Sequence, residues 1–238
     1  MKIALIGYGK MGKAIEEIAL QRKHEIVLKI DIDNFNDFTK EKISKADVAI
    51  EFTGPHSAYQ NIKKAIELDV AVVCGSTGWL EKYDEIKKLV AEKNGALIYA
   101  SNFSVGVNIF FELNKKLATL MSSHPDYEAI IEEVHHTQKK DAPSGTAITL
   151  AEQILKINKK KKRWVNEVSD NPEDLEIISQ RIDPTPGTHS VKYSSAIDDI
   201  EIIHTAHSRK GFALGAVVAA EFLKGKKGIF GMKEVLGL

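Results

Sequence analysis

The sequence has little cysteine, no excess charge of either sign and no long apolar run. Cys74 is the only cysteine among the 238 residues, so an intramolecular disulfide is impossible and a cytoplasmic setting is expected. The 33 basic residues balance the 33 acidic ones, which argues against nucleic acid or an anionic membrane surface as a partner. No apolar stretch reaches the length of a membrane span. We also expect no signal peptide, because a strand begins at once. The expected partner is a small molecule.

The most informative stretch lies near the N-terminus. An apolar run at 3–6 leads into Gly7-Tyr8-Gly9-Lys10-Met11-Gly12, and apolar residues then recur at helical spacing. This order of strand, glycine turn and helix is typical of dinucleotide-binding units. In such a unit Gly7 permits the tight turn, Gly9 lets the pyrophosphate approach the backbone, and Gly12 allows close packing of the helix. The N–H groups and dipole at the helix start then favour phosphate.

A second apolar strand, at 25–30, ends at Asp31. That position is about 20 residues after the glycine motif, where an acidic residue binds the ribose hydroxyls in this kind of unit. A glycine turn alone is weak evidence, because such turns also join strands to helices for purely conformational reasons. The turn and the acidic residue together predict a dinucleotide site, and the alternative is a turn with no function beyond the connection.

Strands and helices alternate through the first part of the chain. Strands expected near 47–52, 70–74 and 96–100 are separated by helices expected near 57–68 and 80–92. This alternation predicts a parallel sheet covered on both faces. Ligands of such sheets lie beyond the carboxyl ends of the strands. The segments in that position are small and polar: 7–12, 53–55, 75–78 and 101–104.

The pattern changes after an apolar helix expected at 106–122. A β-rich run at 127–135, a helix at 146–157 and three later strands at 177–182, 189–196 and 200–207 predict a mixed, largely antiparallel sheet. The apolar helix at 212–224 is rich in small residues and can return to the first domain. We therefore predict an α/β, Rossmann-like dinucleotide-binding domain at 1–106, completed by about 212–238. An α+β substrate-binding domain at 107–211 offers a sheet face as a candidate oligomer interface.

One run of basic residues, at 158–164, is followed closely by acidic residues. The opposite charges favour a solvated loop over a nucleic-acid surface.

Residues 135–146 concentrate titratable side chains between a strand and a helix. His135 and His136 would point to opposite faces of a strand, so they are not expected to share a metal ion. Pro143-Ser144-Gly145-Thr146 is typical of a helix start, whose N–H groups hold a carboxylate, and Lys139 adds a cation. These features suit an anionic substrate. The alternative is an exposed loop with a proline-assisted helix start.

This stretch also carries a family resemblance. From Glu132 to Thr146 the chain is similar to the E-x-H-H-x-x-K-x-D-A-P-S-G-T signature of the dihydrodipicolinate reductase (4-hydroxy-tetrahydrodipicolinate reductase) family, enzymes of bacterial and plant lysine biosynthesis. Residues 75–78 and 101–108 support it, and it covers nearly the whole chain. The resemblance implies NAD(P)H-dependent reduction of 4-hydroxy-tetrahydrodipicolinate to tetrahydrodipicolinate in the diaminopimelate route. It further implies a homotetramer built around the mixed sheet.

The resemblance also implies roles for individual residues. His135 and Lys139 match the acid/base pair of the family. His136, Gly145 and Thr146 match its contacts to a small dicarboxylate substrate. No metal site is expected. The implied cofactor contacts are Gly7, Tyr8, Gly9, Lys10, Met11, Gly12, Asp31, Gly75, Ser76, Thr77, Ser101, Asn102 and Phe103.

The chain departs from better-known members at two places. Its glycine loop is one residue shorter than the G-A-G-G-R-M-G form, and Ile32 follows Asp31 where some members have arginine. Both NADH and NADPH therefore stay open as cofactors. The family reaction needs hydride at C4 of the ring and then protonation of an enamine, for which His135 and Lys139 are both candidates.

Two other functions fit part of the sequence. Another Rossmann-type amino-acid or sugar dehydrogenase would share the glycine loop and Asp31, but would not need the H-H-x-x-K loop before the helix start. A non-catalytic dinucleotide sensor would bind cofactor with the first domain and assemble or dock with the second. Absorbance at 340 nm with the aldolase-derived substrate distinguishes the three.

Overall fold

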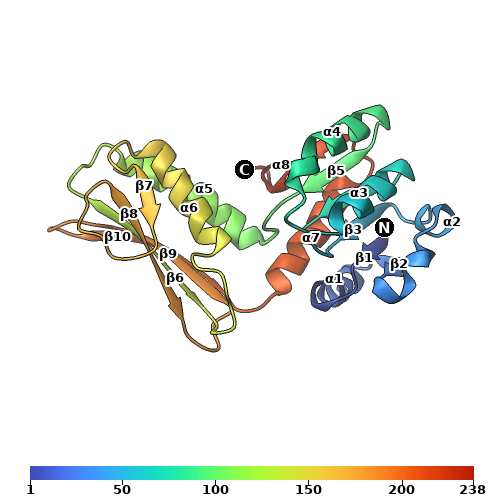
Figure 1. The fold of residues 1–238 in the computed structure, drawn as a ribbon, viewed down its shortest axis with the longest axis horizontal. Helices are drawn as coiled ribbons and strands as arrows, with labels where there is room; N and C mark the ends of the chain where they lie inside the picture. The colour runs from blue at the N-terminus through green and yellow to red at the C-terminus, as the bar shows by residue number, and fades with distance from the viewer. The chain divides into compact units, whose positions relative to one another are not determined.

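The computed structural model describes residues 1–238, which form two compact units (Figure 1). Unit 1 contains residues 1–105 and 209–238, and unit 2 contains residues 106–208. No helix in the structure has both the length and the apolar character needed to cross a bilayer.

Unit 1 is built on a six-stranded parallel sheet with strand order β11-β5-β4-β3-β1-β2. The predicted Rossmann-like sheet is thereby confirmed. Its strands are β1 (Lys2–Ile6), β2 (Glu25–Ile30), β3 (Val48–Glu51), β4 (Ala71–Cys74), β5 (Ala96–Tyr99) and β11 (Gly228–Phe230). The four inner strands are almost wholly buried because helices cover both faces, whereas the edge strands β2 and β11 are partly exposed.

Alternate residues of these strands contribute to two separate cores. Ile3 and Leu5 pack against α1 (Lys10–Gln21), α7 (Lys210–Leu223) and α8 (Met232–Leu236). Ala4 and Ile6 pack against α2 (Lys40–Ile43), α3 (Ala58–Glu67) and α4 (Tyr83–Glu92). Two 3₁₀ helices, η1 (Ile32–Asp37) and η2 (Leu80–Lys82), complete the unit. Figure 1 shows α1 near α7 and α3 near α4.

Small residues bring α7 close to the sheet. A Cβ added to Gly215 would lie 1.7 Å from the carbonyl oxygen of Phe103, so any side chain there would force the helix away. Helix α7 therefore packs directly over the segment that follows β5.

Unit 2 is a five-stranded mixed sheet with strand order β10-β9-β6-β8-β7. Its strands are β6 (Glu128–His135), β7 (Arg163–Val165), β8 (Asp174–Arg181), β9 (Gly187–Ser194) and β10 (Asp199–Ala206). Helices α5 (Val105–Met121) and α6 (Gly145–Ile157) pack on one face.

The mixed character of this sheet is confirmed, and the pairing divides it into two halves. β6, β9 and β10 pair antiparallel, whereas β6, β8 and β7 pair parallel. β8 and β9 are consecutive in the sequence but do not pair with each other, because they lie on either side of β6. The parallel half arises from α6, since a helical crossover after β6 returns the chain to run parallel to it.

The solvated-loop interpretation of 158–164 is wrong for its second half. Lys161 is buried, with its ammonium 2.7 Å from Glu128, and Arg163 lies in β7, 2.7 Å from Asp174. One of the acidic residues that follow the run, Asp174, is thus the ion-pair partner of Arg163 in the edge strand β7.

Candidate functional site

The three glycines after β1 have different surroundings. Gly7 has φ +94°, and a Cβ there would lie 2.1 Å from the Phe52 carbonyl oxygen. A Cβ on Gly12 would lie 2.2 Å from the Gly7 carbonyl oxygen, whereas one on Gly9 would have no heavy atom within 4 Å. The fold therefore requires glycine at the first and third positions, and the space at Gly9 is left for a ligand.

A pocket of about 540 Å³ lies beside this loop, at the carboxyl ends of β1, β2 and β3. Gly7, Gly9, Asp31 and residues 52–57 line it. Asp31 is exposed, and its carboxylate accepts the Ile32 N–H at 2.9 Å. A pocket of this size with one carboxylate and a helix N-terminus fits a nucleotide.

The loops after β3 and β4 are joined by a buried carboxylate, Glu51. Its Oε1 accepts the N–H of Thr53 at 3.1 Å and the Thr53 hydroxyl, and its Oε2 accepts the Cys74 thiol at 3.1 Å. Ser76 Oγ also accepts the Thr53 N–H, at 2.8 Å. Burial raises the pKa of the Cys74 thiol well above its usual range, and the nearby Glu51 adds to the shift. This cysteine is therefore a protonated structural group.

The predicted cofactor residues of these loops differ in exposure. Gly75 lies against the Phe52 ring, and a Cβ added to Gly75 would lie 2.2 Å from that ring. Ser76 is buried, whereas Thr77 is exposed. Ser101 is exposed and Asn102 half-buried. Phe103 is only 2% exposed and packs on Phe52 with ring centroids 5.7 Å apart, so only its backbone is available to a ligand.

Three further predicted residues lie at the start of α1. The Tyr8 hydroxyl donates to Glu16, and its ring lies 4.7 Å from the Lys29 ammonium. Lys10 is exposed and Met11 is half-buried. Lys10 is therefore the one cation of the glycine motif that solvent or a bound anion can reach.

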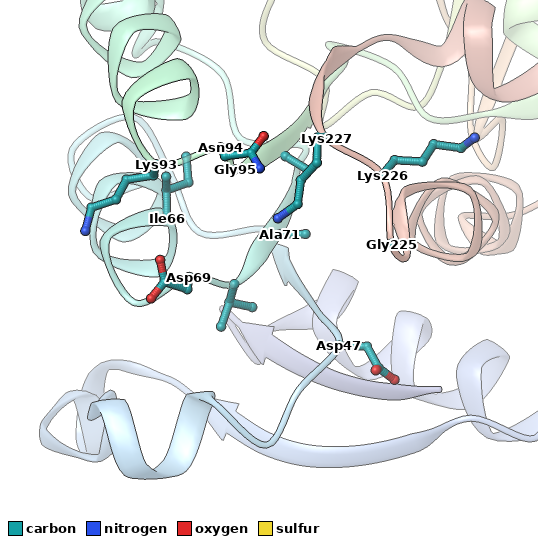
Figure 2. Close-up of a pocket in the computed structure, with 12 residues that line it drawn as sticks. Asp47, Ile66, Asp69, Ala71, Lys93, Asn94, Gly95, Gly225, Lys226 and Lys227 are labelled. Carbon is teal, nitrogen blue, oxygen red and sulfur yellow. The ribbon is translucent and has the colours of Figure 1, made fainter.

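A second pocket, of about 140 Å³, lies at the opposite ends of the strands (Figure 2). Asp47, Ala71 and Gly95 line it, each just before or at the start of a strand. Figure 2 shows Lys93 and Lys226 extending in different directions, so their charges do not converge on a common point. This pocket is separate from the glycine loop.

In unit 2, the loop at 135–146 begins next to Glu133, a residue of β6 that is fully buried. Its two carboxylate oxygens each lie 3.1 Å from the Ser144 N–H. Oε1 also accepts the Ser179 hydroxyl at 2.7 Å and lies 3.2 Å from Arg181 Nη2. Burial by itself would raise the pKa of Glu133, but the adjacent His135 imidazole and the hydrogen bonds from Ser144 and Ser179 outweigh it and hold that pKa well below its usual range.

Two histidines share this carboxylate. His135 Nδ1 lies 3.3 Å from Glu133 Oε2, outside good hydrogen-bond geometry, and His189 Nε2 lies 3.7 Å from the same oxygen. Their rings are 5.0 Å apart, and His189 Nε2 also lies 3.0 Å from Ser144 Oγ. Both imidazoles are buried, so their orientation is set by these few contacts.

Glu133, His135 and His189 place three possible metal-ligand atoms within 4.8 Å of one another. The carboxylate oxygens already accept hydrogen bonds from Ser144 and Ser179, and the Arg181 guanidinium lies beside them. A positive charge at that distance disfavours a second cation. The cluster is better described as a buried, hydrogen-bonded carboxylate with two histidines beside it.

The loop beyond His135 presents the other predicted residues. The Lys139 ammonium donates to both oxygens of Asp141, at 2.8 and 2.7 Å, and lowers the pKa of that carboxyl. His136 is half-buried and accepts the Lys139 N–H with its carbonyl oxygen at 3.1 Å. Ser144 caps α6, with its Oγ accepting the Ala147 N–H. Gly145 is exposed, and no heavy atom lies within 4 Å of a built Cβ.

His189 gives the fold a pH dependence. Burial lowers its pKa to about 4, and the nearby His135 adds to the shift. An unfolded histidine titrates near 6.5, so between these values the unfolded chain binds a proton that the folded chain does not. We expect stability to fall as the pH drops from about 6.5 towards 4, with this residue contributing about 2 kcal/mol of the loss between pH 7 and pH 5.

Urea unfolding at pH 7 and pH 5 measures that loss. His189→Gln should lack the part of the loss of unfolding free energy that His189 contributes between pH 7 and pH 5. His124→Gln, at an exposed histidine, should lose as much unfolding free energy as the wild type. An equal loss in wild type and His189→Gln would contradict the assignment.

The helix start predicted at 143–146 is confirmed, with Ser144 as the cap of α6. Sequence reasoning overlooked Arg181, His189 and Ser179. Their only signal is strand register: β6 pairs Glu133 with Ser179 and with His189, and His135 with Arg181. That register is not visible without the sheet order.

Comparisons with known proteins cover the whole chain. A family model described as "Dihydrodipicolinate reductase, N-terminus" matches residues 1–103, and one described as "Dihydrodipicolinate reductase, C-terminus" matches residues 106–236. A 4-hydroxy-tetrahydrodipicolinate reductase of Christiangramia forsetii is 53% identical over 240 residues, covering 99% of this chain and 98% of that protein. One of Methanoregula boonei is 34% identical over 254 residues, covering 100% and 98%.

The fold has a solved counterpart as well. The structure of dipicolinate-bound dihydrodipicolinate reductase from Paenisporosarcina sp. TG-14 matches with a TM-score of 0.76 at 24% identity, covering 98% of each chain. At that identity the likeness concerns the fold.

Proposed function

This chain belongs to the dihydrodipicolinate reductase family, and on that premise we propose that its two units divide the work of the reaction. The enzyme reduces 4-hydroxy-tetrahydrodipicolinate to tetrahydrodipicolinate with NADH or NADPH, in the diaminopimelate route to lysine. Unit 1 binds the cofactor, and residues 135–146 of unit 2 bind and protonate the substrate. The observation that carries the proposal is the grouping of His135, Lys139 and the exposed start of α6 in one loop.

The residues of unit 1 suit a dinucleotide. Open space at Gly9 admits the pyrophosphate next to the N-terminus of α1, and Asp31 accepts hydrogen bonds from ribose hydroxyls. The glycine loop from Gly7 to Gly12 and the segments 75–77 and 101–103 supply the remaining contacts. When bound, the dihydronicotinamide supplies a hydride to the substrate ring.

The substrate carries two carboxylates, so its site needs donors at both ends. Backbone N–H groups of Gly145 and Thr146 at the first turn of α6 bind one carboxylate. Lys139 and His136 bind the other, and a substrate carboxylate competes with Asp141 for the Lys139 ammonium.

Protonation of the reduced ring falls to His135. Its Nδ1 lies 3.3 Å from the buried Glu133 carboxylate, which fixes the place of the imidazole. Lys139 already has Asp141 as its counter-ion and acts through its charge on the bound carboxylate. A positioned general acid typically contributes 10² to 10⁴ in rate.

We also propose assembly into a homotetramer through the open face of the unit 2 sheet. Helices α5 and α6 cover the other face. Ile130, Val134 and Ile178 are only half-buried on the open face, and Ile203 is 60% exposed. The same face also carries charged side chains such as Glu132 and Lys192. A face that combines apolar and charged groups suits a second copy of the same surface, which light scattering of the purified enzyme measures.

Cofactor choice depends on Asp31. Its carboxylate accepts hydrogen bonds from NADH but repels the 2′-phosphate of NADPH, and two like charges at 4 Å cost about 1 kcal/mol in water and more in a groove. Ile32 is 92% exposed and apolar, so Lys10 is the cation within the glycine loop that can offset this cost. We expect NADH to be preferred or both cofactors to be used, with NADPH use weakening as salt rises.

Values of kcat/KM for both cofactors in wild type, Asp31→Asn and Lys10→Ala test this choice. Asp31→Asn should improve NADPH use by at least about fivefold, and Lys10→Ala should impair NADPH use more than NADH use. A strong NADPH preference that survives loss of Lys10 would place the ribose pocket elsewhere.

The function itself is tested by following NADH at 340 nm with substrate generated by the aldolase reaction. Oxidation that requires this substrate is expected. Cofactor binding without turnover would contradict it.

A further inference from the structure

Glu133 lies where the proposed chemistry has no direct use for it. The carboxylate has no exposed surface, so neither substrate nor cofactor reaches it without rearrangement. Burying a charge is costly unless it is paired and hydrogen-bonded. The surroundings of Glu133 meet that condition, because Ser144, Ser179 and Arg181 all donate hydrogen bonds to the carboxylate.

The groups that surround the Glu133 carboxylate come from four separate elements. His135 lies two residues along β6, Ser144 caps α6, Ser179 and Arg181 lie on β8, and His189 lies on β9. Ser144 and His189 are also in contact with each other, with 3.0 Å between Oγ and Nε2. The Glu133 carboxylate therefore contacts both the His135 imidazole and Ser144, the N-cap residue of α6.

Arg181 extends the same arrangement to the loop. Besides its contact with Glu133, its guanidinium donates to the backbone carbonyl of Asp141 at 2.6 Å and to that of Lys139 at 3.4 Å. The backbone that carries the Lys139 and Asp141 side chains is thus tied to the same buried ion pair.

We propose that Glu133 is a positioning residue, with Arg181 as its counter-charge, that holds His135 and the start of α6 in the geometry needed for proton transfer and carboxylate binding. This inference rests on the roles proposed above for His135 and for Gly145. A purely structural role would affect stability alone, whereas positioning also affects kcat through His135 and KM through α6.

The unit contains a matched control. Asp174, on β8, is also buried and paired with an arginine, Arg163, and it accepts the Ser169 hydroxyl at 2.9 Å. None of its contacts involves residues 135–146. Asp174→Asn therefore reports what loss of a buried carboxylate–arginine pair does to this sheet by itself.

The experiment is a double-mutant cycle in the full-length enzyme, with Glu133→Gln in the wild-type and His135→Gln backgrounds. We expect Glu133→Gln to lower kcat about 10²-fold, to raise the KM for the dicarboxylate several-fold and to leave the KM for NADH unchanged. In the His135→Gln background the same change should lower kcat less than about threefold, because its effect passes through His135. Asp174→Asn should lower the melting temperature while keeping wild-type kcat and KM.

Glu133→Asp provides the same test where the glutamine variant does not fold. It keeps the charge and retracts it by one methylene, and we expect a smaller kcat loss with the same dependence on His135. A solvent deuterium isotope effect larger than in wild type would support positioning, since misplacing the donor makes proton transfer more rate-limiting.

The outcomes distinguish failure of the Glu133 positioning role from failure of the proposed role of His135. A folded Glu133 variant with wild-type kcat, or one whose kcat loss is as large without His135 as with it, would overturn the positioning role alone. Wild-type kcat in His135→Gln would overturn the proposed role of His135 and with it this inference.

Discussion

Replacing His135 with glutamine is expected to lower kcat by about 10²- to 10⁴-fold, the usual contribution of a positioned general acid. Glutamine preserves much of the shape but cannot deliver a proton. Lys139→Ala should lower kcat strongly and also raise the dicarboxylate KM, because it removes a charge that binds substrate. Steady-state kinetics with varied NADH and varied substrate separate these effects, and the KM for NADH should stay near its wild-type value in both variants.

Lys140→Ala is the matched control for this pair. Lys140 adjoins Lys139 in sequence and is exposed, and its replacement should leave both constants near wild type. Normal turnover in both His135→Gln and Lys139→Ala would remove this loop from the reaction.

Placing a methyl group on Gly9 is the change expected to weaken cofactor binding most. The structure accommodates that Cβ without a clash, so the variant should fold with wild-type stability. The methyl group would occupy the path of the pyrophosphate, and losing even one charge-assisted hydrogen bond there, about 1.5 to 3 kcal/mol, weakens NADH binding at least about tenfold.

The opposite result, lower stability, is expected for Gly12→Ala, which serves as the comparison. Its Cβ would lie 2.2 Å from the Gly7 carbonyl oxygen, and overpacking of this kind costs about 1 to 3 kcal/mol of stability. Calorimetric titration with NADH and thermal unfolding distinguish the two variants. Unchanged NADH affinity in Gly9→Ala would show that the pyrophosphate does not approach this loop.

Most regular elements follow from the sequence because their apolar residues are dense and well spaced. The helix at 10–21 has strong periodicity, whereas the strand at 2–6 and the helix at 210–223 are dense apolar runs. β7 and β11 are three residues long and carry no such signal. α2 is a single short turn within a polar stretch, and it is held by Ile43 in the core rather than by its own propensity.

The residues of the candidate site also differ in how far the local sequence identifies them. His135, Lys139 and Gly145 lie within one loop, so a contiguous motif identifies them as candidates. Arg181 and His189 are distant in sequence and reach Glu133 only through pairing of β6 with β8 and β9. The pKa of Glu133 and that of His189 both depend on this burial and pairing, which no local pattern encodes.

The central claim is that unit 1 binds the cofactor while residues 135–146 carry out the chemistry. Single-turnover mixing of NADH-loaded enzyme with excess substrate, followed at 340 nm, tests it most directly in wild type and in His135→Gln/Lys139→Ala. NADH affinity is measured on the same samples by calorimetric titration. The account predicts equal NADH affinity and at least about 10²-fold slower NADH oxidation in the double variant. Equal oxidation rates, or loss of NADH binding in the double variant, would contradict it.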